Sequence, residues 1–214
     1  MKRVFRDSRI QAPSYRRSLL AWYFHFAKDW PWRRGRIFPA ISQAAHERTA
    51  YRSWVAETIF QQTRLTQGLP YFKRFLKLFP TVHHLARATE EAVLKAWEGL
   101  GYYARARHMR EAASRIASGG GFPRDMAGWL ALPGVGPYSA SMLASVLDGA
   151  SAPALDGNVR RVLARWFAVP AAYDASTRHA WQTMSANLIP PSAAWRVPAM
   201  APIAHSAKIG RAHV

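Results

Sequence analysis

The segment Leu132–Tyr138 (LPGVGPY) places two glycines between two short stretches with helical patterning. Without a Cβ, Gly134 and Gly136 let backbone N–H groups at the start of a helix come close to an anion, whose charge the helix dipole favours. The chemistry expected here is contact with a phosphate. A plain helix–helix turn has the same pattern, and the pattern alone favours that simpler interpretation.

Two carboxyl groups have sequence surroundings that suit acid–base or electrostatic chemistry. Glu57 lies in an aromatic and aliphatic helix, where burial would disfavour ionisation and keep the carboxyl protonated as a general acid. Asp156 stands at the start of a helix, where Asp is a common N-cap. The structural alternatives are that Glu57 is a surface acid paired with an Arg and that Asp156 is only a cap.

The charge balance narrows the class of partner. The chain of 214 residues carries 30 Lys and Arg against 12 Asp and Glu, a formal net charge of +18. A polyanion or an acidic membrane would neutralise this charge, and nucleic acid is the first expectation. No apolar run approaches the roughly 20 residues of a membrane span, so we expect no membrane partner.

The chain contains no Cys. This composition excludes disulfides, thiolate zinc sites, Cys nucleophiles and Cys-ligated iron–sulfur clusters. We therefore expect no metal site and no cofactor in this chain.

The elements that must position these residues are helices. Apolar residues recur at helical spacing, strand signals are almost absent, and the fold class is all-α. Gly35–Arg48 is predicted to be a loop, and Pro70 and Pro80 are predicted to interrupt helices. The remaining predicted helices are Leu19–Lys28, a helix from Ala50, Glu90–Trp97, Ala104–Ser118, Met126–Ala131, Tyr138–Leu147, Asp156–Trp166 and Ala175–Leu188.

Four blocks of sequence resemble one known family. Leu132–Ala140 (LPGVGPYSA) and Leu155–Val162 (LDGNVRRV) resemble the hairpin and the catalytic Asp segment of the helix-hairpin-helix DNA glycosylases. Trp54–Thr63 (WVAETIFQQT) and Gly99–Arg107 (GLGYYARAR) narrow the resemblance to the adenine DNA glycosylases that act opposite 8-oxoguanine. The resemblance runs from about Leu20 to Pro191.

The resemblance implies the helix-hairpin-helix DNA glycosylase fold, with two helical lobes and DNA in the cleft between them. We expect a six-helix barrel lobe over residues 49–147 and an incomplete second lobe over 148–191. Residues 1–34 would form a basic arm and a helix that packs with the second lobe, and 35–48 a loop insertion. Residues 192–214 lie outside the family pattern. Lys208–Val214 can be encoded by a common sequencing adapter read in frame, so we expect this tail to be artefactual.

The resemblance also implies catalytic roles. Glu57 would protonate the departing adenine at N7, and Asp156, in one segment with Asn158, would stabilise the sugar cation or its covalent intermediate. Tyr138 takes the hairpin position where related bifunctional lyases carry a Lys nucleophile, which implies a monofunctional enzyme. Tyr138 would be a hydrogen-bonding partner of Asp156, or else a core aromatic residue.

The implied DNA contacts lie in three places. Gln62 and Tyr102 would enter the duplex near the lesion, whereas Thr63 and Leu100 would face 8-oxoguanine. Arg33 would contact adenine. The other implied DNA-binding residues are Gln61, Gly134 and Gly136, together with five arginines expected to contact phosphate: Arg105, Arg107, Arg160, Arg161 and Arg165.

These residues predict hydrolytic removal of adenine mispaired with 8-oxoguanine or guanine in double-stranded DNA, by a monomeric enzyme. The family's four-Cys cluster loop and C-terminal domain are missing from the sequence. The alternatives are a mismatch thymine glycosylase of the same superfamily and a noncatalytic DNA-binding fragment. We expect a cytoplasmic protein, nucleoid-associated if bacterial; the basic arm also suits a transit peptide, but organellar targeting is not expected.

Overall fold

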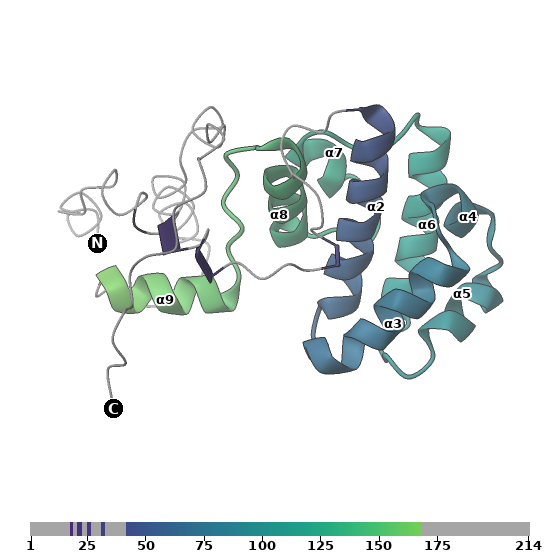
Figure 1. The fold of residues 1–214 in the computed structure, drawn as a ribbon, viewed down its shortest axis with the longest axis horizontal. Helices are drawn as coiled ribbons and strands as arrows, with labels where there is room; N and C mark the ends of the chain where they lie inside the picture. Colours follow the sequence, from purple (N-terminus) through teal and green to yellow (C-terminus); the bar gives the residue numbers. More distant parts are fainter. Residues whose placement is uncertain (1–17, 19–20, 23–24, 27–30, 33–41, 168–214) are drawn as a thin grey trace.

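The computed structural model describes residues 18, 21–22, 25–26, 31–32 and 42–167. Within these residues all regular secondary structure is helical (Figure 1). The helices are α2 (Gln43–Phe60), α3 (Leu65–Leu78), α4 (Val82–Arg87), α5 (Glu90–Trp97), α6 (Ala104–Ser118), α7 (Met126–Leu130), α8 (Pro137–Asp148) and α9 (Gly157–Phe167). The second predicted helix of the C-terminal lobe, Ala175–Leu188, and the tail 192–214 lie outside the described residues, as does most of the N-terminal arm.

Helix α2 begins earlier than predicted. The expected loop over residues 35–48 ends by Ser42, whose hydroxyl accepts a hydrogen bond from the Ala45 amide at 3.2 Å and caps the helix. The first turns of α2 are rich in polar residues, so they show no apolar period. His46 is nevertheless 2% exposed, because α8 covers it.

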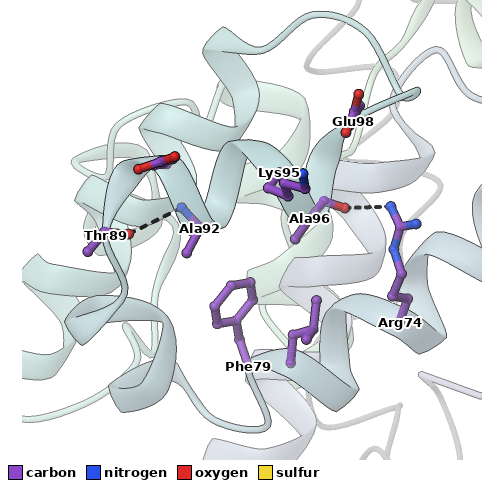
Figure 2. Close-up of a pocket in the computed structure, with 9 residues that line it drawn as sticks. Arg74, Phe79, Thr89, Ala92, Lys95, Ala96 and Glu98 are labelled. Carbon is purple, nitrogen blue, oxygen red and sulfur yellow. Dashed lines mark hydrogen bonds between the residues drawn. The ribbon is translucent and has the colours of Figure 1, made fainter.

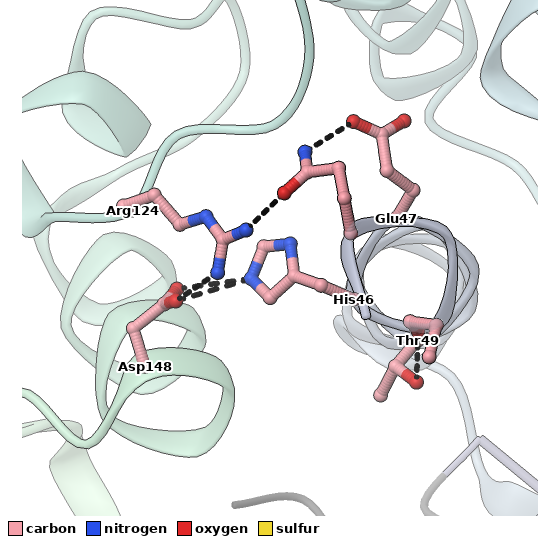
Figure 3. Close-up of polar contacts among 7 residues, drawn as sticks. His46, Glu47, Thr49, Arg124 and Asp148 are labelled. Carbon is pink, nitrogen blue, oxygen red and sulfur yellow. Dashed lines mark hydrogen bonds and ion pairs between the residues drawn. The ribbon is translucent and has the colours of Figure 1, made fainter. Parts of the chain in front are cut away.

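A polar cluster joins the start of α2 to the end of α8 (Figure 3). His46 Nε2 lies 3.1 Å from Asp148 Oδ1, and Arg124 Nη1 donates to the same oxygen at 3.2 Å. Arg124 also donates to the Gln43 side chain. This cluster fixes how α2 and α8 lie against each other, which matters because both helices carry candidate site residues.

The hydrophobic core lies among α2 to α8, where α2 packs against both α3 and α8 and α4 packs against α6. Its largest fully buried side chains include Trp97, Trp129, Phe72 and Phe75. The predicted interruption at Pro70 is wrong: α3 continues through Pro70, which is exposed near the helix start, and buries Phe72 and Phe75. Seven helices, not six, lie between Gln43 and Asp148 in this part of the chain, because the five-residue α7 is separate.

Helix α9 follows an extended segment after α8 and lies beyond the α2–α8 body (Figure 1). Leu163 and Ala164 are its buried residues among those whose side chains are described. None of the described helices has the combination of length and apolar character needed to cross a bilayer.

Candidate active site

The hairpin between α7 and α8 has the geometry that the sequence predicts. Gly134 has φ +74°, and a Cβ there would approach the Cβ of His108 at 2.7 Å, so conformation and packing both require glycine. Gly136 is the N-cap of α8 and makes no side-chain cap bond, and Pro137 follows at the first helical position. The exposed start of α8 is thus open to an anion.

Glu57 is held from across the molecule. Its Oε1 accepts a hydrogen bond of 2.9 Å from the hydroxyl of Ser139, 82 residues away on α8. Gln61 Nε2 donates in turn to Ser139 Oγ at 3.1 Å. Because the single Ser139 hydroxyl proton points to Oε1, a proton carried by Glu57 would lie on Oε2. The packing of α2 against α8 therefore orients this half-buried carboxyl group.

Ser139 is the residue that sequence reasoning missed. It belongs to the LPGVGPYSA block but carried no predicted role. Its side chain is 5% exposed and sits between Glu57 and Gln61. No signal in the sequence singles it out, because Ser141 and Ser145 lie in the same helix and Ser141 is buried as well. Gln61, predicted to bind DNA, donates one hydrogen bond from its side-chain amide to Ser139.

Asp156 caps α9. Its Oδ1 accepts from the Val159 amide at 2.7 Å, and its Oδ2 accepts from Asn158 Nδ2 at 2.9 Å. The Asn158 carbonyl oxygen also accepts from the Arg161 guanidinium. The capping interpretation is confirmed, and the helix dipole favours a negative charge at this position. The half-buried carboxylate is held in a fixed orientation by two donors from its own helix.

Tyr138 lies in the first turn of α8, directly before Ser139. Its ring is 38% exposed, so the alternative role as a buried core aromatic does not hold. The predicted hydrogen bond between Tyr138 and Asp156 stays a prediction. The start of α8 therefore contributes both an exposed aromatic residue, Tyr138, and the hydrogen-bonding partner of Glu57, Ser139.

Two exposed loops carry the residues expected to enter DNA. Gln62 follows α2, and Tyr102, 68% exposed, lies between α5 and α6. Gln62 has φ 60° and Tyr102 has φ 49°, and in the described part of the chain they are the two non-glycine residues with positive φ. Such backbone strain persists only where surrounding contacts hold it, and it concentrates at functional sites.

The comparisons with known proteins decide the family. A model of the HhH-GPD superfamily of base excision DNA repair proteins matches residues 55–186. The chain belongs to this superfamily. Its matched region contains Glu57, the hairpin and Asp156, so the candidate site lies inside the family domain.

Relatives and solved structures extend this result. The adenine DNA glycosylase of Homo sapiens is 39% identical over 171 residues, covering 78% of this chain and 30% of the relative. That of Mycolicibacterium smegmatis is 39% identical over 175 residues, covering 81% of this chain and 55% of the relative. The chain thus spans about a third to a half of the length of the curated relatives it matches.

The fold is that of helix-hairpin-helix glycosylases. The structure of a thermostable thymine-DNA glycosylase is similar, with a TM-score of 0.69 at 21% identity over 84% of this chain and 78% of that chain. A trapped endonuclease III–DNA covalent intermediate gives a TM-score of 0.61 at 21% identity, covering 87% of this chain and 81% of that one. The predicted all-α superfamily fold is confirmed.

Other predicted DNA-binding residues have mixed positions. Thr63 is half-buried, and Leu100, 8% exposed, belongs to the hydrophobic core. Arg160 is half-buried in α9. Arg33 lies outside the described residues. Its neighbour Trp32 packs against the ring of Phe60 at 4.8 Å between centroids.

The prediction that Arg105 contacts phosphate is wrong. Its guanidinium points inward and donates to backbone carbonyls at the end of α2 and in the loop before α6. Arg107, also predicted to contact phosphate, forms an exposed ion pair with Glu90 at 3.0 Å.

A surface groove between α3 and α5 lies apart from the candidate site (Figure 2). It is lined by side chains such as Phe79, Lys95 and Glu98, none of them a predicted site residue. Arg74 donates to the Ala96 carbonyl at 2.9 Å along one wall. This groove therefore contributes no residue to the candidate active site.

No cluster of three or more His, Asp or Glu that could bind a metal occurs among residues 42–167 or the other described positions. The iron–sulfur cluster of related glycosylases requires thiolate ligands, and this chain has no Cys. The residues present do not fit such a cluster, and no step of the proposed chemistry passes through one.

Proposed function

We propose that this protein is a monofunctional adenine DNA glycosylase that hydrolyses the N-glycosidic bond of adenine mispaired with 8-oxoguanine or guanine. The observation that carries the proposal is the Gln61–Ser139–Glu57 hydrogen-bond chain, which fixes a half-buried carboxyl group beside the hairpin. The relatives that match most of the chain are named adenine DNA glycosylases, which supports adenine as the base.

The two carboxyl groups divide the reaction. Glu57 donates its proton to N7 of adenine, so the bond between C1′ and N9 breaks with its electron pair leaving on a neutral base. The anionic Asp156, held by Val159 and Asn158, stabilises the positive charge that develops on the sugar. Water then supplies the hydroxyl group at C1′, and its remaining proton returns to the carboxylate of Glu57.

Tyr138 explains why the reaction stops at base removal. A lyase step requires an amine that attacks C1′ and forms a Schiff base. A phenol at this hairpin position cannot form one, and Tyr138 is exposed at the start of α8. The expected product is an intact strand with an abasic site.

Double-stranded DNA is the proposed substrate. The net charge of +18 and the open start of α8 at Gly136 support phosphate contacts, which give affinity without sequence information. Structural neighbours include a complex of endonuclease III with DNA, which supports the same partner. Gln62 and Tyr102 lie on exposed loops, which supports their insertion into the space left by an extruded adenine.

The test is base release from three duplexes, carrying adenine opposite 8-oxoguanine, adenine opposite guanine, and thymine opposite guanine. The proposal predicts release of adenine from the first two and intact strands until alkali is added. Borohydride should trap no protein–DNA adduct. Release of thymine alone would instead establish the mismatch thymine glycosylase. Duplex binding without any base release would establish a noncatalytic DNA-binding fragment.

A further inference from the structure

The two loops that carry Gln62 and Tyr102 meet at one side chain. We call Gln61–Thr63 and Gly99–Tyr103 the wedge loops, and Gln62 and Tyr102 the wedge residues. Both wedge residues have left-handed backbone conformations, which non-glycine residues rarely adopt. Something in the fold must hold both loops in this state before DNA arrives.

Arg105, at the start of α6, supplies that restraint. Its Nη1 donates at 3.0 Å to the carbonyl of Thr58 and at 2.5 Å to that of Gln61, at the end of α2 and the start of the first wedge loop. Its Nη2 donates at 3.3 Å to the carbonyls of Leu100 and Gly101 in the second wedge loop. One guanidinium thus binds the backbone of both loops.

Aromatic rings complete the arrangement. The Arg105 guanidinium carbon lies 5.5 Å from the ring centroid of Tyr102 and 5.3 Å from that of Trp97. Trp97 Nε1 donates to the Gly101 carbonyl at 3.1 Å. Burial lowers the pKa of Arg105 from its ordinary value, while the interaction with Tyr102 raises it. The positive charge is therefore partly removed from water and is compensated by carbonyl dipoles and ring faces.

We propose that Arg105 is a positioning residue that presets both wedge loops for insertion into the duplex, rather than a phosphate contact. The inference rests on the proposed function, because it assigns Gln62 and Tyr102 to base extrusion. A preset loop avoids the entropic cost of ordering at the moment of binding. Lys cannot replace this function, because one ammonium group cannot span two loops as a planar fork of donors does.

The test compares Arg105→Lys with a matched control, Arg115→Lys, an exposed Arg of the same helix that pairs with Glu111. The readouts are duplex affinity against salt, fluorescence of a 2-aminopurine beside the target adenine, and single-turnover base release. We expect Arg105→Lys to keep duplex affinity within about 3-fold with an unchanged salt slope, and to lower the fluorescence change and the release rate by about 10-fold or more. Arg115→Lys should match the wild type in all three.

A double-mutant cycle tests whether Arg105 acts through a wedge residue. Tyr102→Gly relieves the backbone strain at φ 49° but removes the ring. If Arg105 works partly by holding Tyr102, Arg105→Lys should lower the release rate by a smaller factor in the Tyr102→Gly background than in the wild type; the loss that remains there reports on the Gln61–Thr63 loop. Full additivity of the two losses overturns the proposal. So does a salt slope lower by about one in Arg105→Lys, which is the signature of a lost phosphate contact.

Hydrogen exchange of the free wild-type chain provides a test that needs no variant. In preset wedge loops the amides of Thr63 and Leu100, which donate to the carbonyls of Phe60 and Trp97, should exchange slowly without DNA. Exchange of both at the rate of an unstructured peptide overturns the proposal, even if Arg105→Lys fails to fold. The fluorescence readout separates the two hypotheses. A wild-type chain that unstacks 2-aminopurine but releases no base contradicts the proposed function and still supports wedge insertion, whereas a chain that binds without unstacking contradicts the role of Arg105.

Discussion

The two carboxyl groups of the candidate site are held in opposite ways. Glu57 receives its hydrogen bond from Ser139, 82 residues away, and depends on the packing of α2 against α8. Asp156 receives its hydrogen bonds from Asn158 and Val159, two and three residues away in its own helix. The proposed proton donor, Glu57, is thus oriented by tertiary structure, and the proposed anion, Asp156, by local helix geometry. Substitutions should affect the two groups differently.

The largest expected effect on base release is at Glu57, the carboxyl group that tertiary contacts hold. Glu57→Gln removes the proton donor but keeps a side chain that can accept from Ser139, so base release should fall by about 10²–10⁴-fold. Duplex binding should change by less than about 3-fold, since it depends on phosphate contacts. The measurement is single-turnover release with parallel binding. Glu91→Gln, at an exposed position of α5, is the control; equal release rates in both variants would refute the role of Glu57.

Substitution of Asp156, whose carboxylate is held within its own helix, should lower the rate of base release without lowering the melting temperature. Asp156→Asn keeps an effective N-cap but removes the charge, so release should fall by about 10²–10³-fold while the melting temperature stays constant. Asp125 caps α7 with the same geometry, accepting from the Gly128 amide at 2.7 Å. Asp125→Asn should therefore alter neither quantity. A lower melting temperature with unchanged release in Asp156→Asn would reduce Asp156 to a cap.

A smaller effect on base release is expected at Ser139, which contacts Glu57 rather than the substrate. Ser139→Ala deletes the donor to Glu57 and the acceptor of Gln61, so release should fall by about 10-fold and the free energy of unfolding by about 1 kcal/mol. Ser141→Ala, at a buried position of the same helix, should cost stability alone. Kinetic and denaturation measurements on both variants check this. If the two variants have the same release rate, Ser139 does not orient Glu57.

The smallest expected effect is that of metal removal. We propose that this chain carries no iron–sulfur cluster, because it lacks thiolate ligands. A chelator should change neither base release nor the melting temperature, and the purified protein should contain no stoichiometric iron or sulfide. Finding iron and sulfide in equal amounts, with visible absorption, would show that a different ligand set holds a cluster.

The fold was largely predictable because its helices carry strong local signals. The predicted helices Glu90–Trp97 and Tyr138–Leu147 end within one residue of the observed α5 and α8. Prediction failed where polar residues are buried by tertiary contacts or where a proline is tolerated. The polar residues around the buried His46 leave the start of α2 without an apolar period. Pro70, the sixth residue of α3, does not end that helix, which buries Phe72 and Phe75 beyond it.

The members of the candidate site are proposed from the sequence, whereas the contacts between them come from the structure. The four sequence blocks identified Glu57, Asp156, Gln62 and Tyr102, but gave Ser139 no role and assigned Arg105 to phosphate. From the sequence alone, an Arg that binds backbone carbonyls cannot be distinguished from an Arg that contacts DNA, because both occur in basic stretches. The structure shows those donors directed at backbone carbonyls of two loops.

By itself, the sequence determined the all-α class, the hairpin and the residue types available for acid catalysis, since these follow from periodicity, glycine placement and side-chain chemistry. The tertiary structure decided which groups meet. It brought Ser139 to Glu57 from 82 residues away, and Arg105 to Thr58 from 47 residues away. Contacts at such separations depend on how whole helices pack around a shared core, and no local pattern in one chain encodes that packing.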